Sequence, residues 1–373
     1  MMKKFLVFIS RWITGLVFIF SGIVKGVDPL GTAYKLQDYF AAYNMEWADG
    51  LSLFLSISLC SLEFVVGIAL IFNLWPKLTT RLLAVIMVFF TLLTFYDAIF
   101  APVPDCGCFG DAIKLSNWQT FYKNLVLMIF VVLLLRQQYP RMKISQVKRH
   151  LLALLIVAIA FVSFSWYNYQ HLPMMDFRPW KIGNDMLGDQ NTETKVYLTY
   201  RHKLSGEIKE YVSPNYPWND SVWLANWEFV DQKFVSDAPL VAHNLRAEDM
   251  AGNDFTSALL GGNNMFLLIS YDLHDISGGS LRHLQEFTKL LEKNKLEAAV
   301  ITASLADDAE QFLLKNHLNL SVYFADETVL KTMIRSNPGL VLMHNGLVKG
   351  KWHHNDFPDE GALNILLQQT NEP

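Results

Sequence analysis

The sequence predicts an α-helical bundle of five transmembrane helices, followed by a small β-rich segment and an α/β domain. Three observations predict this architecture. Hydrophobic residues make up 52% of the 373 residues, and charged residues only 18%. The charge is unevenly divided, because residues 1–167 hold 14 of the 31 Lys and Arg but only 8 of the 35 Asp and Glu. Long apolar segments end at Tyr167, and alternating strand and helix patterns follow.

This composition excludes several classes of protein. It does not fit an ordinary soluble protein or a disordered chain, and the basic excess flanks apolar segments, which disfavours nucleic-acid binding. The three cysteines, Cys60, Cys106 and Cys108, are too few for a small fold held together by disulfides. A membrane protein with a water-exposed C-terminal part is the class that fits.

Five segments are long and apolar enough to cross a bilayer, whose ~30 Å hydrocarbon core takes about 20 helical residues. They are Phe5–Val24, Leu51–Leu74, Leu78–Phe100, Trp118–Leu135 and Leu151–Tyr167. The first segment could also be a signal peptide, because Lys3 and Lys4 precede it. No small-x-small cleavage site follows it, however, and four further spans do. We therefore expect the first segment to stay in the protein as a helix.

The distribution of Lys and Arg predicts the orientation of these helices. With the N-terminus in the cytoplasm, the inner flanks are residues 1–11, 73–81 and 136–150, which carry ten Lys or Arg and no acidic residue. The outer flanks, 25–50 and 101–117, mix three Lys with six Asp or Glu. The positive-inside rule thus predicts an inner-membrane protein whose C-terminal region lies in the periplasm.

The chain is expected to divide into four parts: a four-helix membrane domain (1–138), a basic linker with the fifth helix (139–167), a β-rich segment (168–237) and an α/β domain (238–373). In the β-rich segment, Thr194–Tyr200 and Glu207–Val212 flank a glycine turn and predict a hairpin. Aromatic residues follow, namely Tyr216, Trp218, Trp223, Trp227 and Phe229. We interpret them as packing for a small β layer, with a binding face as the alternative.

Strands and helices alternate in the last part of the chain, which predicts an α/β layer fold. The expected strands are Met265–Ser270, Leu296–Thr302, Ser321–Phe324, Gly339–His344 and Leu347–Trp352, and the main helices are Leu281–Lys293, Ala306–Asn316 and Glu360–Gln369. The last two strands flank Asn345-Gly346, a strong signal for a hairpin turn.

This order of elements resembles the thioredoxin fold over residues 238–373. The resemblance implies a cis-proline before the strand that opens the final hairpin, and Pro338 is the candidate. It also implies a cysteine pair after Met265–Ser270, but the chain has no cysteine beyond Cys108. Disulfide exchange needs a thiolate, so we expect a degenerate, catalytically inactive thioredoxin-like domain. His274, which follows the same strand, could form a site with Asp272 or Asp275, but we interpret it as part of a solvated loop.

The outer loop after the third span carries two cysteines that are separated by one glycine. A bond between Cys106 and Cys108 would close a tight and strained ring, and strained disulfides are the more easily reduced ones. Gly107 lacks the Cβ that would crowd this turn. The expected disulfide is either exchangeable or a static bridge that rigidifies the loop. Metal binding is disfavoured because no His lies nearby.

Ionisable residues inside the spans form a second candidate site, because such a group in hydrocarbon costs at least ~2.5 kcal/mol. Glu63 lies three residues after Cys60, so both face the same way, and Cys60 is expected to be inert packing. Glu63 could be a protonated acid, or it could pair with Lys25 or Lys123. Asp97 is a further partner for Lys123. Structural stabilisation and a functional polar site both stay open.

Three separated motifs resemble the DoxX and MauE group of four-helix membrane proteins. They are the segment Phe20–Pro29, Glu63 ahead of Gly67, and the loop Cys106–Gly110. The fifth span and the Cys-less tail make the chain similar to a DoxX-family subgroup without an assigned activity. MauE is implicated in the maturation of a disulfide-rich periplasmic enzyme subunit. This chain carries its own soluble tail, so methylamine metabolism is not implied, and the architectural similarity to quinone-linked thiol oxidases does not establish a function.

The sequence supports three functions. In the favoured one, the tail of a cell-envelope protein binds a periplasmic or membrane protein partner, without enzymatic activity or cofactor, while the bundle anchors it in the lipid bilayer. In the second, Cys106 and Cys108 pass electrons between a periplasmic dithiol and a quinone in the bundle. The third is the handling of a small molecule or lipid around Glu63. Oligomer formation and haem binding stay open.

Overall fold

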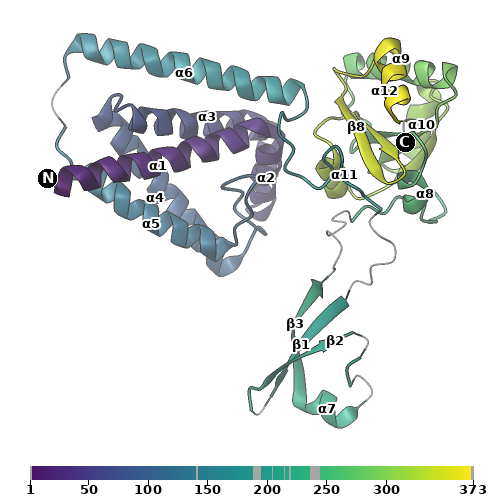
Figure 1. Cartoon of the computed structure of the whole chain (residues 1–373), viewed down its shortest axis with the longest axis horizontal. Helices are drawn as coiled ribbons and strands as arrows, with labels where there is room; N and C mark the ends of the chain where they lie inside the picture. The colour runs from purple at the N-terminus through teal and green to yellow at the C-terminus, as the bar shows by residue number, and fades with distance from the viewer. Residues whose placement is uncertain are drawn as a thin grey trace.

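The computed structural model describes residues 2–139, 142–187, 195–203, 205–213, 215–217, 220–235 and 244–370. In these residues a helical bundle, a three-stranded sheet and an α/β domain follow one another along the chain (Figure 1). Five helical segments of the described chain are long and apolar enough to cross a membrane: Lys4–Val27, Glu46–Ile71, Pro76–Phe100, Asn117–Leu135 and Ile144–Gln170. The helical part is therefore the membrane domain, as expected.

Glycines allow the first and third helices of the bundle to approach closely. The helical elements are α1 (Met2–Val27), α2 (Pro29–Ala42), η1 (Glu46–Leu51), α3 (Ser52–Ile71), α4 (Pro76–Phe100), α5 (Asn117–Leu135) and α6 (Ile144–Gln170). A Cβ on Gly22 of α1 would lie 2.9 Å from Phe64 of α3, which is too close for a real contact. A Cβ on Gly26 would lie 2.6 Å from Phe161 of α6. Small residues thus bring α1 against two neighbouring helices.

Helix α2 lies between the first two candidate spans, where no element was expected. Its N-terminus is capped by Asp28, whose Oδ1 accepts a hydrogen bond of 2.8 Å from the Gly31 amide. Pro29 occupies the first helical turn, a position that needs no amide donor. The helix lies at the end of the bundle nearest the α/β domain (Figure 1), so it positions side chains between the two domains.

The α/β domain is built on a five-stranded mixed sheet. Its strands are β4 (Met265–Ser270), β5 (Ala298–Thr302), β6 (Ser321–Phe324), β7 (Gly339–His344) and β8 (Leu347–His353), and its helices are α8 (Thr256–Leu260), α9 (Gly278–Lys293), α10 (Ala306–Lys315), α11 (Glu327–Met333) and α12 (Glu360–Thr370). The strand order is β6-β5-β4-β7-β8. Strands β4, β5 and β6 are parallel to one another, β7 is antiparallel to β4, and β8 is antiparallel to β7. These bounds agree closely with the expected elements.

Central strand β4 is buried on both faces of the sheet. Phe266 and Leu268 pack with Phe287 of α9 on one face, whereas Leu267 and Ile269 pack with residues of the opposite face. Such burial explains why this strand reads as a continuous apolar run instead of an alternating one. The continuous run made it one of the clearest strands to predict.

Residues 172–187, which we call the strap, follow α6 and pack against the α/β domain. Trp180 is fully buried in the core of that domain, together with Met186. The Gly183 amide donates to the Val348 carbonyl oxygen of β8 at 2.8 Å. The strap thus departs from the expected division, in which 168–237 is one β-rich segment, because its apolar side chains complete the neighbouring core. The expected boundary between 237 and 238 lies outside the described residues.

The β-rich segment is a three-stranded antiparallel sheet with order β2-β1-β3. It consists of β1 (Lys195–His202), β2 (Ile208–Val212), the short helix α7 (Ser221–Asn226) and β3 (Trp227–Val235). The hairpin was expected, but β3 was not. Tyr200 packs edge-on against Trp223 with ring centroids 4.6 Å apart, and Trp223 stacks on Trp227. These contacts support the packing interpretation; Trp218 lies outside the described residues.

Candidate functional site

The loop between α4 and α5 brings the two outer cysteines together. The sulfurs of Cys106 and Cys108 lie 3.2 Å apart, compared with ~2.05 Å in a disulfide, and both are thiols. Gly107 between them has a φ of +63°, which favours glycine, and its amide donates to Asp105 Oδ1 at 3.0 Å. The structure thus presents the reduced pair, and the expected disulfide stays a prediction for the oxidised protein.

The two thiols differ in how readily they ionise. The hydrogen bond from Cys106 and the charges of Lys123 and Lys25 lower the pKa of Cys108 to about 6, against the opposing effect of burial. The same hydrogen bond, together with burial, raises the pKa of Cys106 well above its usual value. The thiolate is the nucleophilic form of cysteine. Cys108 is therefore the reactive member of the reduced pair, and Cys106 keeps its proton.

A buried ion pair supports the loop from within the bundle. Lys25 Nζ of α1 lies 2.6 Å from Glu63 Oε1 of α3, and both side chains are only 6% exposed. The Ser21 hydroxyl lies 2.8 Å from Glu63 Oε2 and 2.7 Å from the Cys108 carbonyl oxygen. Lys25 is thus the partner of Glu63 among the alternatives that the sequence left open. The Ser21 hydroxyl thus lies between the ion pair and the backbone of the reactive cysteine.

The other two intramembrane polar residues have different partners from those expected. Lys123 lies over the ring of Phe109, 4.5 Å from its centroid, and it forms no ion pair with Asp97 in the described part of the chain. Asp97 Oδ2 accepts a hydrogen bond of 2.7 Å from the Tyr39 hydroxyl of α2. The reason is that helix α2, which the sequence did not predict, places the Tyr39 hydroxyl beside Asp97 near the end of α4.

The cysteine loop forms part of the wall of a cavity inside the bundle, which we call the inner cavity. It has a volume of about 540 Å³, and its lining is mostly apolar side chains of α1, α2, α3 and α4. Cys106, Cys108, Lys25, Glu63 and Lys123 contribute polar groups to the lining. The inner cavity is thus an apolar chamber with reactive and charged groups at its wall.

A second space, which we call the outer cleft, lies on the other side of the loop. Its volume is about 530 Å³, and it is lined by α2, by Asp105, Gly107, Gly110 and Asp111 of the loop, by the strap and by α11. Thr32, Lys35 and Gly107 line both spaces. The loop therefore separates an apolar chamber in the bundle from a polar cleft between the two domains.

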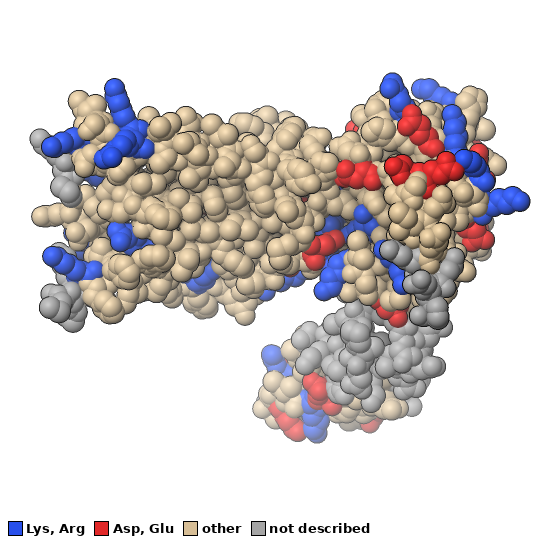
Figure 2. All heavy atoms as spheres, turned by 45° about the horizontal axis from the view of Figure 1, so that its top comes forward, with Lys and Arg blue, Asp and Glu red and all other residues tan. Residues whose placement is uncertain are grey.

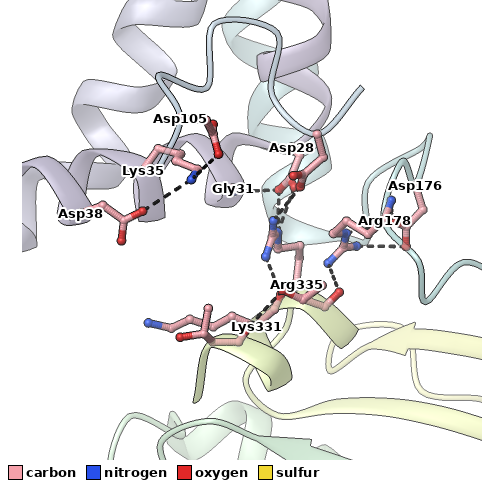
Figure 3. Close-up of polar contacts among 12 residues, drawn as sticks. Asp28, Gly31, Lys35, Asp38, Asp105, Asp176, Arg178, Lys331 and Arg335 are labelled. Carbon is pink, nitrogen blue, oxygen red and sulfur yellow. Dashed lines mark hydrogen bonds and ion pairs between the residues drawn. The ribbon is translucent and has the colours of Figure 1, made fainter. Parts of the chain in front are cut away.

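Arg335, directly after α11, joins the α/β domain to the membrane domain (Figure 3). Its Nε lies 2.9 Å from Asp28 Oδ2, and its Nη2 lies 3.3 Å from Asp111 Oδ2. The Arg335 and Arg178 charges hold the pKa of Asp28 below its usual value although burial opposes this. Nearby, the Tyr34 and Tyr271 hydroxyls lie 3.0 Å apart. We call these contacts the clamp; they border the outer cleft.

The candidate residues of the tail form no second catalytic group. The Asn337–Pro338 peptide bond is cis, at the position given by the fold resemblance. Asn337 accepts from the Ser270 hydroxyl at 2.7 Å and donates to the Asp272 carbonyl at 2.6 Å. His274 is exposed and lies 3.4 Å from Asp308, as in a solvated loop. No cluster of His, Cys, Asp and Glu among the described residues could hold a metal ion.

Four residues of this site were missed by the sequence-based reasoning: Asp28, Tyr34, Tyr39 and Arg335. The first three lie in or just before α2. The Asp28-Pro29 pair is a helix-start signal that could have located that helix. Arg335 had no comparable signal, because its partners come from the other end of the chain.

Comparison with known families covers the membrane domain. Residues 3–137 match the family model described as methylamine utilisation protein MauE, so this part of the chain is MauE-like. The match includes α1 to α5 and the cysteine loop, and it ends before the strap and the α/β domain. Searches of curated proteins and of solved structures found no match. The likeness to DoxX proteins and to the thioredoxin fold stays a prediction.

Proposed function

We propose that the chain is an inner-membrane thiol–disulfide redox protein. In this proposal Cys106 and Cys108 take electrons from a periplasmic dithiol and pass them to a lipid-soluble quinone. One observation carries the proposal: the loop with the two thiols separates an apolar chamber from a polar cleft. A redox protein that serves one lipid-soluble and one water-soluble reactant needs this arrangement. The non-enzymatic scaffold does not, so the geometry favours the second of the sequence-based functions.

The electron balance of the proposed reaction involves two thiols and one quinone. Oxidation of the pair forms the Cys106–Cys108 bond and releases two electrons and two protons. The Cys108 proton leaves when that thiol ionises, and the Cys106 proton leaves as the bond forms. A bound quinone supplies the acceptor for both electrons and both protons and leaves as a quinol. The dithiol of the partner protein then reduces the new disulfide by thiol–disulfide exchange, which proceeds through attack by a thiolate. The partner becomes the oxidised product.

The lining of the inner cavity fits a quinone. Its walls are apolar, and Lys25 and Lys123 contribute hydrogen-bond donors near the thiols, which suits a ring with two carbonyl oxygens. Exposed apolar side chains of α3 and α4, among them Leu62, Val85 and Phe89, also line the cavity. An isoprenoid tail therefore has a path towards the lipid, with Lys25 and Lys123 placed to orient the ring.

The charge distribution supports a periplasmic location for the loop and the α/β domain. In Figure 2, Lys and Arg but no Asp or Glu are visible at the end of the bundle far from the α/β domain, and an uncharged belt follows. Acidic residues appear on and near the α/β domain. The positive-inside rule assigns the basic end to the cytoplasm, which leaves the thiols on the oxidising side.

We assign the α/β domain a recognition role in this reaction. Its strand order, the cis Pro338 and the cysteine-free segment after β4 support a degenerate thioredoxin-like domain. The clamp holds this domain beside the outer cleft. A partner protein bound there would have its dithiol close to the loop.

Direct oxidation of the reduced, full-length protein by decylubiquinone tests the proposal. Wild-type protein in detergent should convert one quinone to quinol per chain and lose the two thiols of the loop, as counted with a maleimide of high mass. Cys106→Ser and Cys108→Ser should abolish this reaction. Cys60→Ser is the matched control and should keep it, because Cys60 is fully buried on α3 and lines neither the inner cavity nor the outer cleft.

Quinone-independent loss of thiols, or equal reaction in the Cys106→Ser and Cys108→Ser variants, would overturn the redox function. The non-enzymatic binding function would then be the better one. A membrane-impermeant maleimide applied to intact spheroplasts should also label reduced Cys108. Absence of labelling there, with labelling in inverted vesicles, would contradict the orientation.

A further inference from the structure

Asp97 is a buried carboxyl group with an unused oxygen at the outer end of α4. Its side chain has no exposed surface, and Oδ1 has no hydrogen-bond partner within the described part of the chain. A buried polar atom without a partner costs ~1–3 kcal/mol, and buried ionisable residues in membrane segments are functional candidates by default. Asp97 therefore calls for an explanation beyond packing.

Tyr39 connects this carboxyl group to the thiol that keeps its proton. The Tyr39 hydroxyl donates to Asp97 Oδ2 at 2.7 Å. Tyr39 and Cys106 both line the inner cavity, and the Tyr39 hydroxyl favours the ionised form of the Cys106 thiol, which acts against the rise in its pKa. Tyr39 of α2 thus lies between the carboxyl group of α4 and the thiol of the loop.

We propose that Tyr39 and Asp97 carry away the proton of Cys106 when the disulfide forms. The inference rests on the proposed redox function and adds two residues to it. Cys108 already reacts as a thiolate, so the second sulfur must lose a proton before it can attack. In this step the Cys106 S–H bond breaks, its proton moves to the Tyr39 oxygen, and the Tyr39 proton moves to Asp97.

The other products of this step balance the reaction. The Cys106 sulfur attacks the Cys108 sulfur and the S–S bond forms, while the bond between Cys108 and the oxidant breaks. The electron pair of that bond leaves with the oxidant, which is the quinone in the proposed reaction and a thiopyridone in the titration below. Asp97 ends as a neutral acid, whose proton then passes to the reduced acceptor or to water. The Tyr39 hydroxyl is regenerated because it gives one proton and receives one.

Several titratable groups surround this path. Tyr43, directly after α2, and Tyr96 of α4 lie near Asp97. Lys25 of α1 and Cys108 face Cys106, and Lys123 of α5 and Glu63 of α3 face Cys108. Asp97 is the carboxyl whose hydrogen-bond partner, Tyr39, lines the inner cavity together with Cys106.

A two-phase thiol titration tests the path without a quinone. The reduced full-length protein is mixed with 4,4′-dithiodipyridine, an uncharged disulfide whose released thiopyridone is coloured. In the first phase Cys108 displaces one thiopyridone, and in the second Cys106 displaces another and closes the disulfide. Asp97→Asn should leave the first phase unchanged and slow the second ~10²-fold at pH 7, the low end of general-base effects.

The pH profile distinguishes proton transfer from a structural role. In the wild type the second phase should change little between pH 6 and 8, because the base is internal. In Asp97→Asn and in Tyr39→Phe, the rate of the second phase should rise with the hydroxide concentration, about tenfold per pH unit. Tyr96→Phe is the matched control and should behave as the wild type, because Tyr96 is partly exposed and lies outside the path.

Two outcomes separate failure of this inference from failure of the proposed function. A normal first phase with equal second-phase rates and pH profiles in wild type, Asp97→Asn and Tyr39→Phe would overturn the proton path alone. A single phase in the wild type, with no closure of the Cys106–Cys108 bond, would overturn the redox function and the path with it. If Asp97→Asn does not fold, Tyr39→Phe still decides the question.

Discussion

At the scale of single residues, Glu63 links the stability of the bundle to the position of the reactive thiol. Its carboxylate binds Lys25 on one oxygen and lies beside the Ser21 hydroxyl on the other. Ser21 in turn contacts the carbonyl oxygen of Cys108. Structural support and function are therefore not separate explanations for this residue, because the ion pair stabilises the helices that hold the loop.

Glu63→Gln should destabilise the protein strongly. The amide keeps the volume of the side chain but leaves the Lys25 charge buried without a counter-ion, and breaking a buried pair in this way costs ~3–5 kcal/mol. Thermal unfolding in detergent should show a clearly lower Tm. Glu46→Gln, at an exposed position in η1, is the matched control; equal Tm values for the two variants would show that the pair does not stabilise the fold.

At the scale of elements, the strap is attached to the sheet by buried charges as well as by apolar packing. Asp176 of the strap lies 2.8 Å from Arg178 Nε and 2.7 Å from Lys351 Nζ of β8. Burial, together with the Arg178 charge, lowers the pKa of Lys351 to about 7. The attachment of the strap therefore depends on pH near neutrality.

The stability of the tail should rise with pH above neutrality. Above pH 7 the folded chain releases the Lys351 proton, whereas the unfolded chain holds it up to about pH 10, so the free energy of unfolding rises by up to ~1.4 kcal/mol per pH unit. Below pH 7 both states are protonated, and the full cost of burying the charge is present. Lys351→Met removes this cost.

Melting of the full-length protein at several pH values checks this expectation. The Tm of Lys351→Met relative to the wild type should be highest below pH 7 and fall as the pH rises to 9. Lys349→Met, at a half-buried position on the same strand, should show a constant difference. A constant difference for Lys351→Met as well would mean that Lys351 stays protonated in the folded chain throughout this range.

The elements that could be predicted are those whose signal is local. Strands β4 and β7 are unbroken apolar runs, and the membrane helices follow from length and hydropathy. The strap gave no such signal, because Trp180 is buried only by contact with strands that occur much later in the chain. Likewise, Lys25 was one of two possible partners for Glu63, since the rotation of α1 against α3 is set by glycine contacts and not by the charges.

At the scale of the whole molecule, two domains from opposite ends of the chain meet at the clamp. Arg335 is 6% exposed, and it bonds to Asp28 at the start of α2 and to Asp111 in the cysteine loop. A buried Arg–carboxylate pair of this kind gives geometric specificity as well as energy. The clamp therefore sets the width of the outer cleft beside the thiols.

Arg335→Ala should release the α/β domain from the membrane domain without unfolding either. Tyr34→Cys and Tyr271→Cys, in a background without the three native cysteines, place thiols on both sides of the clamp. A short bismaleimide should join them efficiently while Arg335 is present and poorly in Arg335→Ala. Arg282→Ala removes an exposed arginine of α9 and should keep the cross-link; efficient cross-linking in both would show that the clamp does not hold the domains.

The strap also has a consequence for how the protein is made. Its residues leave the ribosome directly after the last membrane helix, but their partner Val348 in β8 is synthesised near the end of the chain. Until then the core that buries Trp180 is incomplete. Arg335 is also synthesised late, so its ion pair with Asp28 forms only after most of the chain has been made. A truncated or stalled chain thus displays an unshielded tryptophan next to the bilayer, and chaperones and proteases recognise such exposed apolar surface on unfinished products.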